Sequence, residues 1–230
     1  MSPQCDMIVR KDIVVILSSL FIFLPFLMFG QSARDSESLL TELKGQMSSY
    51  AASHIVFDFR ANNSAGDLLV EQSGEFVAQG DSFRMTTPLL DIYCDGKSKW
   101  ILDNEMLEMM IFPHDSSDDD ITENPFVVLK NLNLPDYKFP KRAKVIEEEY
   151  GLVQVVELTP KEKDINYISI FLYFSTDTSD LVALEYHSRA GETYFVKIDS
   201  LEGIKEKSSD YFVPDDTLLD NSDLYITDLR

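Results

Sequence analysis

The chain has 230 residues, and its 20 lysines and arginines face 40 aspartates and glutamates, which gives a formal net charge of −20. This length corresponds to one domain or to two small ones. The acidic balance argues against a nucleic acid or an anionic membrane surface as a standing partner, because both would repel the chain. We expect the excess of acid to serve solubility, with steering towards a basic docking face as the alternative.

The N-terminal region carries an apolar run over 13–29, behind an Arg-Lys pair and ahead of small residues. This order is typical of a secretory signal peptide. We predict that residues 1–30 are a signal peptide, cleaved after Gly30 or, as the second choice, after Ala33. Residues 31–230 would then form one exported domain. The alternative is an uncleaved membrane anchor, because a run of this length reaches the lower limit for a spanning helix.

The chain has two cysteines, Cys5 and Cys94. Cys5 lies in the predicted leader, so the mature chain would keep one thiol and form no intramolecular disulfide. An exported domain without disulfides must be held together by core burial, and about 200 residues suffice for that.

The first predicted helix covers 35–50, with Ser36 as its N-cap and leucines at three- and four-residue spacing. Beyond it the apolar residues alternate, which is typical of strands. An acidic loop at 114–123 and a short helix entered through Pro125 separate two sets of strands. The tail, 215–230, is expected to be irregular and mobile. The predicted strands cover 55–60, 68–79, 82–87, 89–94, 99–103, 107–112, 144–148, 153–158, 167–175, 182–188 and 192–198.

These elements together predict an α+β fold that is mainly β. About eleven antiparallel strands are too many for a small flat sheet and would curl. We therefore expect a curled antiparallel sheet, an unclosed β-barrel, with two or three short helices laid across its open side as a lid.

Motifs for catalysis and metal binding are missing from the sequence. The histidines, His54, His114 and His187, are far apart and lie in no zinc-binding pattern. The acidic cluster of 115–123 lacks the turn glycine of an EF-hand loop, and Gly96-Lys97-Ser98 lacks the earlier glycine of a phosphate-binding loop. We expect neither enzymatic activity nor a metal or organic cofactor.

The segment from Phe83 to Trp100 carries the most informative motifs. Phe83-Arg84-Met85, Pro88 and Tyr93-Cys94-Asp95-Gly96-Lys97 form two predicted strands that meet at an Asp-Gly turn. This pattern resembles the LolA-type periplasmic carriers of outer-membrane lipoproteins. Further pieces follow in the family's order: the first helix, Asn124-Pro125-Phe126, Leu158-Thr159-Pro160-Lys161 and the terminal Phe212-x-Pro214.

The resemblance implies a chaperone that shields lipoprotein acyl chains in an apolar hollow and carries them across the periplasm, from the inner to the outer membrane. Its partners would be acylated lipoproteins, an ATP-driven release complex of the inner membrane and an outer-membrane acceptor, and it would act as a monomer. We expect the hollow to be lined by Phe57, Phe59, Phe76, Phe83, Met85, Ile92, Trp100, Leu102 and Met109. We expect the lid to present Leu40, Leu43, Met47, Phe126 and Leu129.

The chain departs from the family at Gln79-Gly80-Asp81. Family members often have a basic residue and a proline there, and the arginine pins the closed lid. A lid latch is therefore either missing here or built differently. Two other functions stay open: a carrier of another envelope lipid, such as a glycolipid or pigment precursor, and a half-barrel sensor or docking module of the cell envelope.

Overall fold

The computed structural model describes residues 33–115, 121, 123–130, 132–162 and 165–230. The predicted signal peptide and most of the acidic loop lie outside these described residues. Within the described part of the chain, no helix combines the length and the apolar character needed to cross a membrane.

The described residues form a 13-stranded sheet. Its strands are β1 (Ala52–Asn62), β2 (Leu68–Gln79), β3 (Ser82–Thr86), β4 (Leu90–Cys94), β5 (Ser98–Asp103), β6 (Glu108–Pro113), β7 (Tyr137–Lys138), β8 (Lys144–Glu148), β9 (Gly151–Pro160), β10 (Tyr167–Ser175), β11 (Leu181–Ser188), β12 (Thr193–Ile204) and β13 (Tyr225–Asp228). The spatial order is β13-β6-β5-β4-β3-β2-β1-β12-β11-β10-β9-β7, and β8 also pairs with β9. The pairings are antiparallel, except that β13 runs parallel to β6. The eleven predicted strands are all present, whereas β7 and β13 were not predicted.

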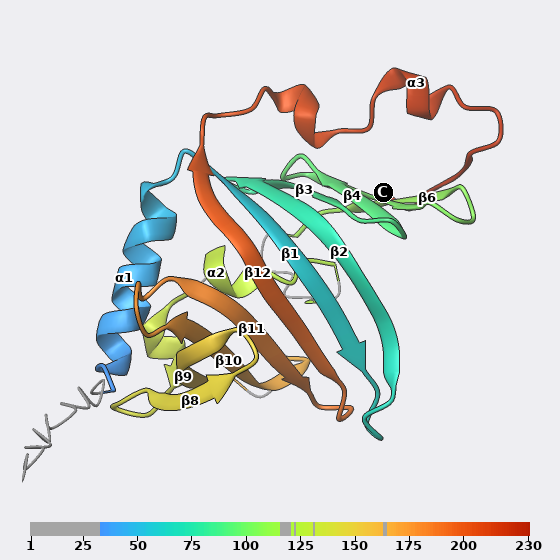
Figure 1. Cartoon of the computed structure of the whole chain (residues 1–230). Helices are drawn as coiled ribbons and strands as arrows, with labels where there is room; N and C mark the ends of the chain where they lie inside the picture. Colours follow the sequence, from blue (N-terminus) through green and yellow to red (C-terminus); the bar gives the residue numbers. More distant parts are fainter. Residues whose placement is uncertain (1–32, 116–120, 122, 131, 163–164) are drawn as a thin grey trace, which may run out of the picture. The chain divides into compact units, whose positions relative to one another are not determined.

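The sheet curls but does not close, because the two ends of its strand order, β13 and β7, do not pair with each other. Figure 1 shows the long strands β1, β2 and β12 running obliquely between β8–β11 on one side and β3–β6 on the other. A register shift between Val56 and Phe57 marks a bulge in β1, which increases local twist. Opposite it, Gly74 leaves room for the Phe57 ring, since a Cβ on Gly74 would lie 2.8 Å from Phe57 Cζ. The curled, unclosed sheet with its antiparallel pairings confirms the predicted fold class.

Helix α1 (Ser36–Ser49) begins one residue later than predicted, and its N-cap is Asp35. The Asp35 carboxylate accepts a hydrogen bond from Ser38 N–H at 3.3 Å, so the expected cap, Ser36, is wrong. Asp35 takes this role because its backbone is extended while Ser36 is already helical and buried. The leucines of α1 all face inward and are buried: Leu39, Leu40 and Leu43.

Helix α2 (Val127–Lys130) lies within the curve of the sheet, and Figure 1 shows α1 alongside it. Both helices contribute to one large apolar cluster, which we call the interior cluster. The sheet contributes residues from β1 to β4 and from β9 to β12 to the same cluster. The face of the sheet that carries this cluster is the inner face. The two helices therefore cover the inner face.

The outer face carries two smaller apolar clusters. One is formed by Val153, Val155, Tyr173 and Ala183. The other, which we call the tail cluster, is formed by Leu102, Met109 and Ile111, with Trp100, Leu218 and Leu224 packed against it. Alternation along the strands separates these clusters from the interior.

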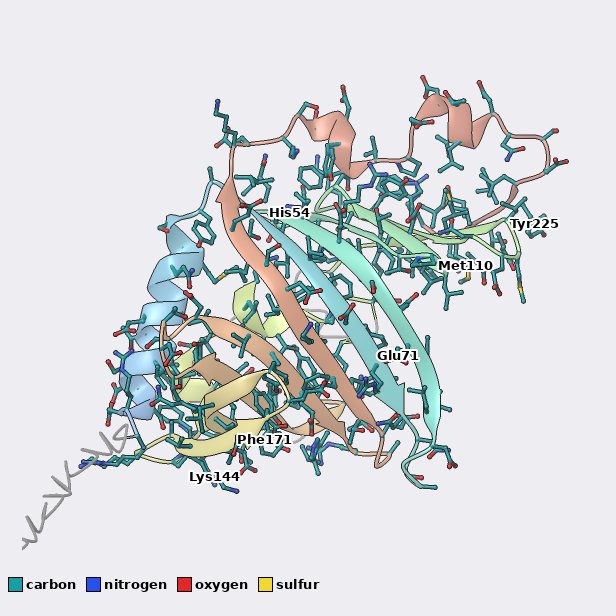
Figure 2. All side chains as sticks on the ribbon, viewed as in Figure 1. His54, Glu71, Met110, Lys144, Phe171 and Tyr225 are labelled. Carbon is teal, nitrogen blue, oxygen red and sulfur yellow. The ribbon has the colours of Figure 1, made fainter. Side chains whose placement is uncertain are left out.

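The C-terminal tail packs over the tail cluster through Leu218 and Leu224. It contains a 3₁₀ turn, η2 (Ser209–Phe212), helix α3 (Asp216–Leu219) and β13. Tyr225 N–H donates to Leu107 O at 2.9 Å, which starts the pairing with β6; Met110 and Tyr225 mark this end of the sheet in Figure 2. The expectation that regular structure ends before residue 215 is thus wrong, because Leu218 and Leu224 find apolar partners on the outer face.

Candidate functional site

A cavity of about 230 Å³ lies where the C-terminal half of α1, the turn between β2 and β3, and the α2 segment meet. Its volume falls short of the roughly 300–1,000 Å³ of most small-molecule pockets. The two helices therefore leave only a small hollow over the inner face of the sheet. Its apolar wall is made by Met47, Ile55, Phe76, Phe83, Phe126 and Leu129.

Phe126 places a ring of the lid among the rings of the sheet. Its centroid lies 5.2 Å from that of Phe57 in an edge-on arrangement and 4.9 Å from that of Phe76. Phe76 in turn stacks on Phe83 at 5.7 Å. Aromatic pairs of this kind contribute about 0.5–1.5 kcal/mol each beyond their burial. The Phe126 side chain thus fills part of the hollow that it closes.

The turn between β2 and β3 is tied to the lid by an ion pair. Lys130, the last residue of α2, donates from Nζ to Asp81 Oδ1 at 2.6 Å. This hydrogen bond and the charge of Lys130 lower the pKa of Asp81. Gly80 has φ +58, which lets the chain turn sharply just before Asp81. The β2–β3 turn supplies the anion of this pair, and α2 supplies the cation.

Two further contacts anchor the chain just before Phe126. Tyr186, fully buried in β11, donates its hydroxyl to Pro125 O at 2.7 Å. Burial raises the pKa of Tyr186 well above its usual value, so the hydroxyl keeps its proton. Before Asn124, Glu123 forms an ion pair with Lys99 of β5, which is buried. The segment that leads into α2 is thus held by the ion pair of Glu123 with Lys99 and by the hydrogen bond from Tyr186.

The predicted site residues divide between the two faces of the sheet. The interior cluster contains Phe57, Phe76, Phe83, Met85, Ile92, Leu40, Leu43, Phe126 and Leu129, with Phe59 and Met47 packed against it. Of these, the cavity itself is lined by Met47, Phe76, Phe83, Phe126 and Leu129.

The placement of Trp100, Leu102 and Met109 in the hollow is wrong, because they belong to the tail cluster on the outer face. Ile101, between the first two, packs against the interior cluster instead. A shift by one residue reverses the face of a strand, and β5 is apolar on both faces, so its pattern alone could not show which side faces inward.

Sequence reasoning did not single out Lys44, Lys130 or Tyr186. Lys44 and Lys130 line the cavity together with Asp81 and His114. Tyr186 and Lys130 bond to residues far away in the sequence, Pro125 and Asp81, and no local motif marks these contacts. Charged residues near the two predicted helices were the available signal for the lysines.

Metal and thiol chemistry has little support among the described residues. No group of three or more histidine, cysteine, aspartate or glutamate side chains is placed there to hold a metal ion. Cys94 is buried, and burial raises the pKa of its thiol to about 11. The thiolate form that attacks electrophiles and binds metals is therefore scarce at neutral pH.

Comparison with known proteins points to one family. The family model of the outer membrane lipoprotein carrier protein LolA matches residues 49–215. No curated protein matches the chain.

Several solved structures are similar at low sequence identity. An uncharacterized conserved protein from Thermus thermophilus has a TM-score of 0.48 and 8% identity, and the match covers 84% of this chain and 98% of that one. A putative outer membrane lipoprotein-sorting protein domain from Vibrio parahaemolyticus has a TM-score of 0.43 and 10% identity, over 76% and 94%. A LolA superfamily protein from Nitrosomonas europaea has a TM-score of 0.41 and 11% identity, over 79% and 99%.

Proposed function

We propose, because the chain belongs to the LolA family of outer membrane lipoprotein carrier proteins, that it shields the acyl chains of lipoproteins in the periplasm and carries them from the inner to the outer membrane. The observation that supports this most is the cavity between the lid and the inner face of the sheet, with an apolar wall that includes Phe76, Phe83 and Phe126. On this proposal the protein binds cargo and catalyses no reaction.

The energetics of acyl burial explain why a closed hollow suits a carrier. Each methylene removed from water contributes about 0.8 kcal/mol, so a sixteen-carbon chain gains about 12 kcal/mol at full burial. Two or three chains would exceed the practical ceiling of about 18–21 kcal/mol for non-covalent binding. A carrier must therefore offset much of this gain by a change in its own structure.

The lid can provide that offset. To admit an acyl chain, Phe126 has to leave its contacts with Phe57 and Phe76, and the ion pair between Asp81 and Lys130 has to open. An exposed ion pair contributes only about 0.2–1 kcal/mol, whereas the contacts of a buried phenylalanine are worth about 3–5 kcal/mol as judged by its truncation to alanine. The apolar contacts of Phe126 therefore dominate the cost of opening, and the ion pair adjusts it.

Delivery follows from the same energies. Spontaneous loss of a buried acyl chain to water would be slow, so release requires contact with an acceptor that covers the chain in turn. We propose that the cargo is loaded at an ATP-driven release complex of the inner membrane and delivered to an acceptor at the outer membrane, with the carrier acting as a monomer.

A soluble-complex assay tests this function. A detergent-solubilised triacylated lipoprotein is mixed with the exported protein, the detergent is removed, and the mixture is separated by gel filtration. We expect the lipoprotein to stay soluble in a complex with the carrier. The same lipoprotein without its acyl chains is the control and should elute alone. Precipitation of the acylated lipoprotein regardless of the carrier would refute the proposal.

A further inference from the structure

The cavity is positively charged at its mouth, although the chain as a whole is strongly acidic. The lysines, histidine and carboxylate that line it are Lys44, Asp81, His114 and Lys130. With the histidine neutral, these groups sum to one positive charge, against −20 for the chain. Surface charges beyond about 10 Å are largely screened at 0.1 M salt, so the groups that line the cavity act more strongly on a ligand in it than distant acidic residues do.

Lys44 has no counter-ion among the described residues to explain its position. It is an exposed residue of α1 that follows buried Leu43 and lines the same cavity as Met47 one turn later. No ion pair joins Lys44 to any other residue in the described part of the chain. Its ammonium group therefore stands at the rim of an apolar hollow, where an anion can approach it.

Lys130 is paired, but with a partner on another element. Its bond to Asp81 joins the lid to the β2–β3 turn, and both residues line the cavity. The side chains of Lys130 and Asp81 are 35% and 61% exposed, so solvent and a ligand can both reach them. Because the pair is partly exposed, an anionic ligand can replace Asp81 as the partner of Lys130.

We propose that the hollow prefers acylated cargo that carries a negative charge, a carboxylate or a phosphate, close to its acyl chain. Lys44 and Lys130 hold this anion at the mouth, and Asp81 occupies its place on Lys130 while the hollow is empty. The inference rests on the proposed acyl-binding function and narrows its cargo.

The exchange couples recognition to opening. When the cargo's anion takes the place of Asp81 on Lys130, the link between α2 and the β2–β3 turn is released as the acyl chain enters. A neutral cargo has to break the same link without replacing it. Charge-assisted hydrogen bonds are roughly twice as strong as neutral ones, so the anionic cargo binds more tightly at equal chain length.

The test compares two fluorescent lipids with the same acyl chain and a charged or an uncharged head group, cis-parinaric acid and its methyl ester. Binding is measured by fluorescence titration of the exported protein, with inorganic phosphate as a competitor. We expect the acid to bind roughly 2- to 30-fold more tightly than the ester, from two partly exposed ion pairs. Lys44→Gln should reduce this preference for the acid over the ester by about 2- to 5-fold. Millimolar phosphate should displace neither lipid, because it lacks an acyl chain.

Lys144→Gln is the matched control. Lys144 is an exposed lysine of β8 that does not line the cavity, and Figure 2 shows it at the β8 edge of the sheet. Equal affinities for acid and ester, or the same loss of preference in Lys144→Gln, would overturn the charge inference while leaving acyl shielding intact. A protein that binds neither lipid would overturn the proposed function with it.

Discussion

Truncation of Phe126 separates the two roles of this side chain, closing the lid and filling the hollow. Phe126 is 2% exposed and contacts Phe57 and Phe76. Phe126→Ala should reduce the free energy of unfolding by about 3–5 kcal/mol, because a buried ring is lost and its space is left. Yet that space adjoins the cavity of about 230 Å³, so an acyl chain can occupy it.

The assay is thermal unfolding with and without cis-parinaric acid. If the enlarged hollow binds the lipid tenfold more tightly, the ligand adds about 1.4 kcal/mol more stability to Phe126→Ala than to wild type at saturating concentration. Phe174→Ala is the control, because Phe174 is equally buried in the interior cluster but does not line the cavity. It should lose similar stability and gain no extra ligand effect.

Two outcomes would refute this reasoning. A ligand effect no larger than in wild type would mean that the hollow does not receive acyl chains. An equal increase in Phe174→Ala would mean that any loosening of the core admits the lipid. Phe126→Leu, with a smaller loss of volume, allows the same comparison if the alanine variant does not fold.

Three further substitutions and treatments test other contacts. Asp81→Asn removes the ion pair with Lys130, which lowers the pKa of Asp81; its stabilisation of about 0.2–1 kcal/mol is present above the unfolded-state pKa of about 3.9 and lost as pH falls through the lowered value, so wild type and variant should differ at pH 7 and converge in acid. A difference that persists at pH 2 would contradict the pair. Tyr186→Phe removes the donor to Pro125 O and should cost about 1–3 kcal/mol, with hydrogen exchange rising in α2 more than in β10; uniform acceleration would argue against a tether. Cys94, whose pKa burial raises to about 11, should react with iodoacetamide at pH 8 far more slowly in the folded protein than in urea, and similar rates would refute its burial.

The sequence predicted the strands and the lid because both follow from local patterns. Alternation located the eleven strands, and leucine spacing located α1. The single apolar stripe of α1, with Leu40 and Leu43, already required an apolar surface beneath it. The inner face of the sheet is that surface.

Alternation within β5 and β6 could not show which face is inner. Trp100, Leu102 and Met109 alternate with Ile101 and Met110, and both sets are apolar. The register of the β4–β5 hairpin sets the face, because Ile101 lies opposite Ile92 and therefore shares the inner face with it. Leu218 and Leu224 of the C-terminal tail then cover the outward set.

The ion pair between Asp81 and Lys130 was also beyond local reasoning. The departure at Gln79-Gly80-Asp81 was visible as a missing basic residue, but its replacement depends on Lys130, at the end of α2. Two opposite charges far apart in an acidic chain have many possible partners. Tyr186 likewise gains its role only when β11 meets Pro125 in the folded chain.

Native mass spectrometry of the exported protein, isolated without detergent, tests the central claim most directly. The account predicts that part of the protein carries an acylated lipoprotein, and that this fraction falls when cells are treated with an inhibitor of lipoprotein processing. Protein that is free of acylated cargo under both conditions would contradict it.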